Sequence, residues 1–109
     1  MPIVRGLDHV AITCAYVDAT IEWYTRIAGA ELQYADLWHD GKLPVAILQL
    51  GASRLSLHRA SDPASPHAEA PTTGSGDLCF RAMGTPEAIV EELRAYGIDI
   101  VEGPVSRVS

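Results

Sequence analysis

Two histidines in strand-like stretches carry the chemistry that a metal site needs. His9 lies in the stretch 7–14, and His58 lies near the end of the stretch 54–59. Because successive side chains of a strand alternate between its faces, each histidine falls on the smaller, more polar face of its strand. Neutral imidazole is the commonest metal ligand, and two imidazoles with a carboxylate can hold a divalent ion while leaving positions open for substrate. We therefore predict both histidines as metal ligands; the alternative is ordinary solvent-facing or hydrogen-bonded strand residues.

A third strand-like stretch, 77–83, begins with a carboxylate. Asp77 is a candidate third ligand, and the alternatives are a hydrogen-bond acceptor behind a ligand or an ordinary residue at a strand start. Three further polar side chains share the faces of these residues and are predicted to contact the substrate: Thr13, Ser56 and Arg81. For Arg81 the alternative is a surface ion pair. His39, in an expected turn, and His67, in an expected linker, are interpreted as surface residues.

The elements that must position these residues form a β-α-β-β-β series in the first half of the chain. Asp18 is suited to cap the N-terminus of the helix, and Gly29 is suited to end it. The Asp-Gly pair within "HDGK" predicts a hairpin between the second and third strands. The expected elements are, in order, a strand at 7–14, a helix at 18–29 and strands at 31–38, 44–50 and 54–59.

A shorter series follows a segment that looks like a linker. Residues 60–76 are rich in Pro, Ala, Ser, Thr and Gly and show no periodicity. The series then continues with a strand at 77–83, a helix that starts at Thr85-Pro86-Glu87 and ends at Gly97, and a strand at 98–102.

The second half repeats the order of elements found in the first. A shift of 68 residues aligns Gly29 with Gly97, so that the two helix ends match. Few aligned residues are identical, and the alternative is two unrelated β-α-β units of similar length. The same shift applied to His58 leads past Ser109. We therefore expect the second unit to be an incomplete copy that ends after β-α-β and lacks its last two strands.

Length and charge narrow the class of protein. The 109 residues suffice for one domain with a hydrophobic core. Fourteen Asp and Glu against eight Lys and Arg leave a net charge of −6, which argues against a nucleic-acid surface. No apolar run reaches the ~18–20 residues that span a bilayer, and the first residues do not resemble a signal peptide, so we expect a cytoplasmic protein. Cys14 and Cys79, each in an apolar stretch, are then expected to be buried free thiols.

The chain resembles the vicinal oxygen chelate superfamily, which includes glyoxalase I, extradiol dioxygenases and bleomycin-resistance proteins. The similar stretches are "LDHVAITCAYVDATIEWYTRIAGAELQ", "RLSLHRA" and "PTTGSGDLCFRAMGTPEAIVEELRAYGIDIVEGPVSR". The resemblance implies an α+β fold in which paired βαβββ modules form a cupped mixed sheet around a divalent ion. The single glyoxalase-like domain at 1–109 would consist of a first module at 1–59, the linker at 60–76 and a partial second module at 77–109.

The same resemblance assigns positions in the metal site. His9 falls on the first-strand ligand of the family, His58 falls where many members have a second ligand, and Asp77 falls on a fifth-strand ligand that is often histidine. Family members continue beyond a segment like "EGPVSRVS" into two strands, whose glutamate completes the site. Without these strands we expect unpaired strand edges, and therefore a homodimer, with strand exchange as one way to form it.

The function that the resemblance implies is a divalent-metal-dependent enzyme of the glyoxalase or dioxygenase type. Its small oxygenated substrate would chelate Fe, Mn, Zn or Ni, and lyase, isomerase and dioxygenase chemistry all remain open. Two alternatives stand beside this function. One is a non-catalytic drug- or metabolite-binding protein of the bleomycin-resistance type, and the other is a truncated, inactive remnant without metal.

Overall fold

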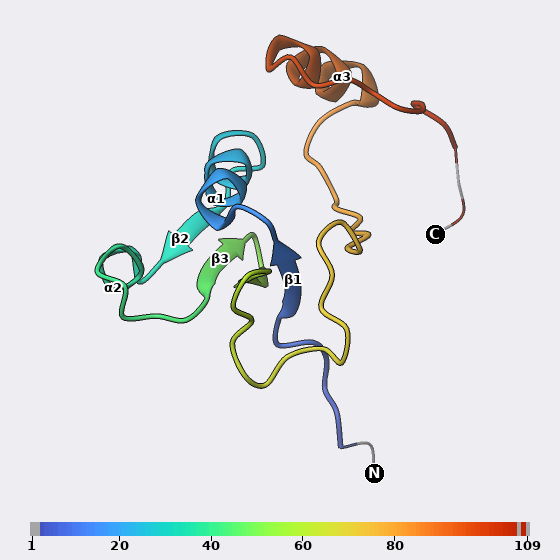
Figure 1. Cartoon of the computed structure of the whole chain (residues 1–109). Coiled ribbons are helices and arrows are strands. Elements are labelled where there is room, and N and C mark those ends of the chain that lie inside the picture. The colour runs from blue at the N-terminus through green and yellow to red at the C-terminus, as the bar shows by residue number, and fades with distance from the viewer. Residues whose placement is uncertain (1–2, 107, 109) are drawn as a thin grey trace. The chain divides into compact units, whose positions relative to one another are not determined.

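The structure of the chain, a computed structural model, describes residues 3–106 and 108 (Figure 1). The chain divides into two compact units, Met1–Asp77 and Leu78–Ser109. The first unit contains a mixed sheet and two helices, and the described part of the second contains one helix. Within the described residues, no helix combines the length and apolar character needed to cross a membrane.

The sheet of the first unit has four strands in the order β1-β4-β3-β2. β1 pairs with β4 in parallel, and the other two pairings are antiparallel. This confirms an α+β fold with a mixed sheet. The elements in chain order are β1 (Val10–Cys14), α1 (Val17–Arg26), β2 (Glu31–Gln33), α2 (Ala35–His39), β3 (Ala46–Leu50) and β4 (Ser53–Arg59).

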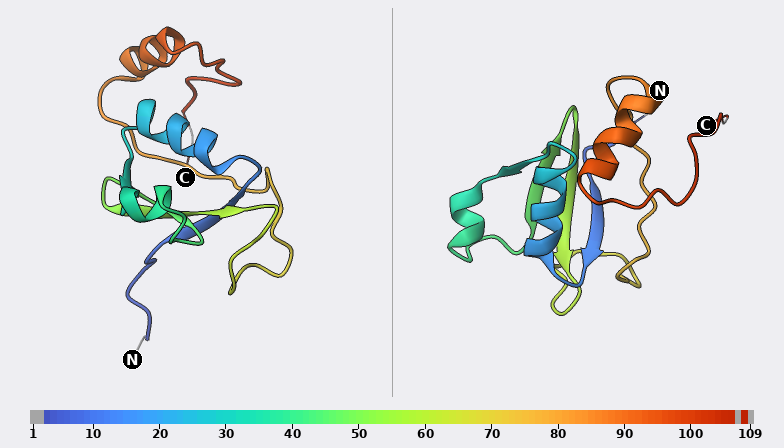
Figure 2. Two further views of the ribbon diagram at one scale, coloured as in Figure 1. Left: turned by 60° about the vertical axis from the view of Figure 1, so that its left-hand side comes forward. Right: turned by 90° about the horizontal axis from the view of Figure 1, so that it is seen from above.

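The apolar face of the sheet packs under α1. On this face, Leu57 of β4 lies level with Ile12 of β1 and Ala46 of β3. α1 lies across the sheet and contacts β2, β3 and β4 (Figure 2). Removing these apolar side chains from water is the main source of stability for such a layer. The buried apolar residues are Cys14, Val17, Ile21, Ala30, Trp38, Ala46, Leu48, Leu55 and Leu57.

The opposite face of the sheet has the polar character that the alternation of the sequence predicted. In the register of the parallel pair, Thr13 lies beside His58 and Ala11 beside Ser56. Ser56 and His58 are nevertheless buried, each with 9% of its surface exposed. The sheet therefore buries polar groups on this face, which normally requires partners for them.

The expected strand at 31–38 is wrong beyond Gln33. Tyr34 adopts a left-handed backbone with φ of 50°, which ends β2, and the short helix α2 follows. The Asp40-Gly41 pair closes this helix and makes no hairpin turn, because the amides of Gly41 and Lys42 donate back into the helix, to Trp38 O at 3.0 Å and to Leu37 O at 2.8 Å. β2 and β3 still pair antiparallel, with α2 and a loop between them.

The expected N-cap of the first helix is also wrong, and the reason is a tertiary contact. α1 begins one residue earlier, after Tyr16, and has no side-chain cap. The Asp18 carboxylate instead accepts a hydrogen bond of 3.0 Å from Trp38 Nε1. The guanidinium carbon of Arg59 lies 4.4 Å from the centre of the Trp38 ring. Trp38 therefore links α1, α2 and β4. The predicted helix end is confirmed, since Gly29 has φ of 73° and Ala30 N donates to Tyr24 O.

The second unit forms its helix but not its expected strands. α3 (Pro86–Ala95) begins where predicted, with Thr85 Oγ1 accepting from Ala88 N at 3.2 Å, and Gly97 follows it with φ of 77°. No strand is assigned in the described residues of 77–83 or 98–102. A helix satisfies its own backbone, whereas a strand needs a neighbour, so only the helix forms from local sequence. Cys79 is exposed, which corrects the expectation of a buried thiol, while Cys14 is buried as expected.

Trp38 should contribute to stability through its indole N–H as well as through its buried ring. We expect Trp38→Phe to lower the free energy of unfolding by about 0.5–1.5 kcal/mol, the usual worth of one such hydrogen bond. Urea unfolding followed by far-UV circular dichroism measures the change. The matched control is Trp23→Phe, because Trp23 is 41% exposed and its removal should cost less. Equal losses in the two variants would contradict a role for the bond to Asp18.

Candidate functional site

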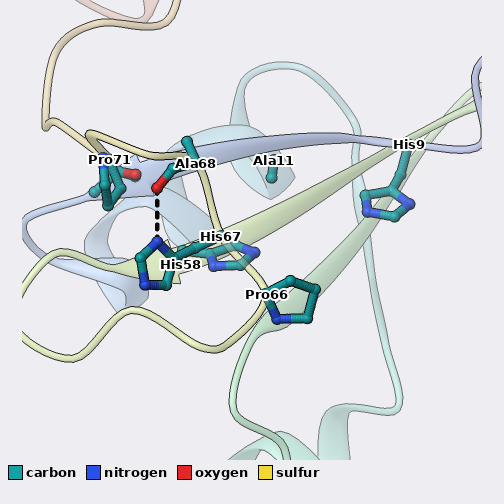
Figure 3. Close-up of a pocket in the computed structure, with 8 residues that line it drawn as sticks. His9, Ala11, His58, Pro66, His67, Ala68 and Pro71 are labelled. Carbon is teal, nitrogen blue, oxygen red and sulfur yellow. Dashed lines mark hydrogen bonds between the residues drawn. The ribbon is translucent and has the colours of Figure 1, made fainter.

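A pocket of about 270 Å³ lies in the first unit, between the polar face of the sheet and the segment that follows β4. Figure 3 shows its side chains. β1 and the residue before it contribute one wall, β4 contributes His58, and residues 66–71 contribute the other wall. The lining residues are His9, Ala11, Thr13, His58, Pro66, His67, Ala68 and Pro71. The parallel pairing of β1 with β4 therefore brings together residues that are far apart in the sequence.

His58 is the most unusual group in this pocket. The residue is 9% exposed, and its Nδ1 atom meets no hydrogen-bond partner within the described part of the chain. Burial lowers the pKa of His58, and the neighbouring His67 and His9 lower it further. The ring is therefore neutral near pH 7. A buried nitrogen without a partner costs free energy, so an ordered water, an ion or a ligand is expected to satisfy it.

His9 is oriented from outside the pocket by its neighbour in the chain. Its Nδ1 lies 2.9 Å from Asp8 Oδ1, and the hydrogen bond to His9 lowers the pKa of that carboxyl group. When Nδ1 is held by an acceptor, Nε2 is the nitrogen left to bind a metal or a ligand. A carboxylate behind a histidine is the usual arrangement in metal sites. Asp8 was not singled out in the sequence, although its position directly before His9 was visible there.

The predicted substrate contacts differ in their placement. Thr13 lines the pocket. Ser56 is buried on the same face, beside Ala11, but is not among the lining residues. Arg81 is exposed and belongs to the second unit. Of the two candidates in the first unit, Thr13 therefore lines the pocket with the two histidines and Ser56 does not.

The metal site is not assembled in the conformation that the structure describes. Asp77 is exposed and does not line the pocket. Across residues 3–106 and 108, no group of three or more His, Cys, Asp or Glu side chains is arranged to hold an ion. The pocket offers two of the three predicted ligands, His9 and His58, on one face of two paired strands. Imidazole is a donor that borderline divalent ions accept.

His67 lines the same pocket, although the sequence analysis placed it at the surface of a linker. Its Nδ1 lies 2.6 Å from Ala68 O, and its side chain is exposed. No periodic pattern marks the segment around it, so the alternation that identified the other two histidines does not apply. The one feature of the sequence that could have indicated this position is that His67 follows the end of β4 by only a few residues, which keeps it near His58.

The lowered pKa of His58 makes a prediction for stability against pH. The unfolded chain takes up a proton near pH 6.5, whereas folded His58 resists it, so its stabilising contribution is complete above that pH and is lost as the pH falls toward the folded pKa. We expect His58→Gln to unfold with a smaller difference between pH 7.5 and pH 5.5 than the unmodified chain does. Urea unfolding at both values measures this. His39→Gln, at an exposed site, should keep the full difference; an unchanged difference in His58→Gln would contradict the prediction.

Comparison with known proteins connects this geometry to a family. The chain is 36% identical over 104 residues to the glyoxalase domain-containing protein RDO1 of Mycosarcoma maydis, covering 95% of this chain and 55% of that protein. It is 33% identical over 105 residues to the virulence protein STM3117 of Salmonella typhimurium, covering 96% of this chain and 69% of that protein. The chain thus spans about half the length of the first relative and about two thirds of the second.

Solved structures also resemble the chain. The crystal structure of the Salmonella virulence protein superposes with a TM-score of 0.86 at 31% identity, over 99% of this chain and 81% of that one. A structure from the mobile metagenome of V. Pseudocholerae gives 0.85 at 27% identity, over 100% of this chain and 80% of that one. The family profile described as Glyoxalase/Bleomycin resistance protein/Dioxygenase superfamily matches residues 6–109. The chain belongs to this superfamily.

Proposed function

We propose that the chain is the metal-binding part of an enzyme that acts on a small oxygenated substrate. The observation that carries this proposal is His58, which lines the same pocket as His9 and whose buried Nδ1 lacks a partner in the described chain. A neutral imidazole held in a pocket without a hydrogen-bond partner is a ready metal donor. Membership of the glyoxalase and dioxygenase superfamily supports the same reading.

The chain's own residues would prepare the site in distinct ways. Burial keeps His58 neutral and its lone pair available, while Asp8 holds the His9 ring so that Nε2 is presented. A bound Fe, Mn, Zn or Ni ion would supply Lewis acidity toward two adjacent oxygens of the substrate. Thr13 lines the pocket and, in this proposal, would donate a hydrogen bond to a substrate oxygen. Asp77 remains our proposed third ligand from the sequence, and reaching the pocket requires it to move.

The size of the pocket restricts the substrate. A volume of about 270 Å³ is at the lower limit of typical ligand pockets, which begin near 300 Å³. It suits a small metabolite and leaves little room for a polymer or a large cofactor. We propose a substrate with two neighbouring oxygen atoms, because such a compound can occupy two open positions on one ion.

Homodimerisation is part of the proposal. The described residues do not supply three ligands in one place, and α3 is the one element assigned in the described part of the second unit. A second copy can provide both a ligand and a strand edge. A dimer with exchanged strands would meet the two needs together.

A second candidate function is binding without turnover. Half of the lining side chains are apolar, namely Ala11, Pro66, Ala68 and Pro71. Such walls can hold a drug or metabolite by burial of apolar surface, as expected for a relative of bleomycin-resistance proteins. Metal dependence distinguishes the two functions, because sequestration by apolar walls does not need an ion.

The metal proposal is tested by native mass spectrometry of the purified chain with Zn²⁺, Ni²⁺, Mn²⁺ or Fe²⁺. We expect about one bound ion per chain, within a dimer, and a loss of affinity of at least about 10-fold in His9→Ala and in His58→Ala. His39→Ala should bind like the unmodified chain, because His39 is exposed and does not line the pocket. A chain that takes up none of the four ions would reject the metalloenzyme and leave the binding function.

A further inference from the structure

The two sides of the pocket differ in chemical character (Figure 3). The residues on the sheet side that can hydrogen-bond are His9, Thr13 and His58, and the apolar residues on the loop side are Pro66, Ala68 and Pro71. A ligand between the two sides would meet nitrogen and oxygen atoms on one of them and hydrocarbon on the other. The pocket is therefore suited to a compound with one polar end and one apolar end.

The backbone of the loop side adds little hydrogen bonding to its apolar side chains. Pro66 and Pro71 have no N–H group to donate. The carbonyl oxygen of Ala68 lies 2.6 Å from His67 Nδ1, so this contact already engages the imidazole that the loop contributes. The loop side therefore favours the hydrocarbon part of a ligand, because an oxygen placed against it would lose hydrogen bonds to water.

Ala11 leaves a hollow on the sheet side of the pocket. It lies in β1 between Thr13 and the preceding His9, and all three residues line the pocket, because side chains two residues apart in a strand point to the same side. At roughly 3.3 Å per residue, each of these neighbours is about 7 Å away along the strand. Ala11 places only a methyl group between the imidazole and the hydroxyl group. A larger side chain at this position would fill the hollow.

We propose that the pocket binds a short aliphatic compound with oxygen atoms at one end, and that Ala11 and Pro71 limit the length of its hydrocarbon end. This inference rests on the proposed small-molecule function and adds the class of ligand. Thr13 and the imidazoles of the sheet side hydrogen-bond the oxygens directly, and the hydrocarbon end lies between Ala11 and the loop. Side chains of the chain itself make these contacts, so this binding does not need an ion.

The volume of the pocket limits the hydrocarbon end. About 270 Å³ is just below the range of typical ligand pockets. Each fully buried methylene group tightens binding about fourfold, which is the equivalent of its transfer out of water. We therefore expect the affinity to rise with chain length while the added carbons still lie between Ala11 and the loop. It should stop rising once the chain extends past Pro71 into water.

The test measures dissociation constants for the terminal vicinal diols of propane, butane and pentane. The full chain is first freed of metal with EDTA, and binding is followed in amide NMR spectra. We expect the affinity to rise by up to about fourfold with each added carbon. The amide signals of Ala11, Thr13 and Ala68 should shift most, because these residues line the pocket.

Ala11→Val is the deciding variant, and Ala15→Val is its matched control. Valine suits a strand, so Ala11→Val should fold, and because it fills the hollow we expect the gain with chain length to disappear. Ala15 is exposed and does not line the pocket, so Ala15→Val should bind the diols like the unmodified chain. Pro71→Ala removes part of the loop wall and should reduce the gain per carbon. Far-UV circular dichroism checks that the variants keep their fold.

The outcomes separate this inference from the proposed function. Equal dissociation constants for the three diols, or binding of none of them, would overturn the inference, and so would an Ala11→Val chain that binds like Ala15→Val. The metalloenzyme would still stand in each case, because its test is the uptake of an ion by the chain without EDTA. A chain that takes up no ion but shows the gain with chain length would keep the inference and leave the binding function.

Discussion

The parallel pairing of β1 with β4 is the interaction on which the site depends. It sets Thr13 beside His58 and places His9, just before β1, on the same face. β4 can serve this purpose because it lies inside the sheet, with β3 on its other side. Leu55 and Leu57 alternate with Ser56 and His58 along it, so one strand contributes to the core under α1 and to the pocket. A shift of one residue in this register would move each side chain of the strand to the opposite face, and both the core under α1 and the pocket would be lost.

Trp38 and His58 are both buried in the first unit, but the polar atoms of their rings differ in hydrogen bonding. The Trp38 N–H donates to Asp18, and the ring packs under Arg59, so its burial is compensated and it joins three elements. The His58 Nδ1 has no such partner in the described chain. Native proteins satisfy nearly all buried polar atoms, so each exception calls for an explanation such as an ordered water, an ion or a catalytic role. The uncompensated atom therefore marks the pocket more clearly than the types of the lining residues do.

The second unit illustrates the difference between local and non-local structure. Its helix is specified within ten residues, by Thr85 at the start and Gly97 after the end. Its expected strands carry apolar side chains that lie exposed, such as Met83 at 97% and Val101 at 100%. Pairing with another strand is what gives such segments both backbone hydrogen bonds and burial.

The sequence by itself determined the α+β class, the β-α-β-β-β order of the first unit, the ends of two helices and the face on which His9, Thr13 and His58 lie. These features follow from periodicity and from residues such as Gly29 and Gly97, which act within a few positions. The tertiary structure alone decided the rest. α2 takes the place of the end of the expected strand, with Trp38 donating to Asp18 of α1, and His67 lines the pocket because the loop after β4 folds back over the sheet. The first outcome involves a contact between residues that are distant along the chain, and the second involves a segment without periodicity. Local sequence patterns predict neither of them.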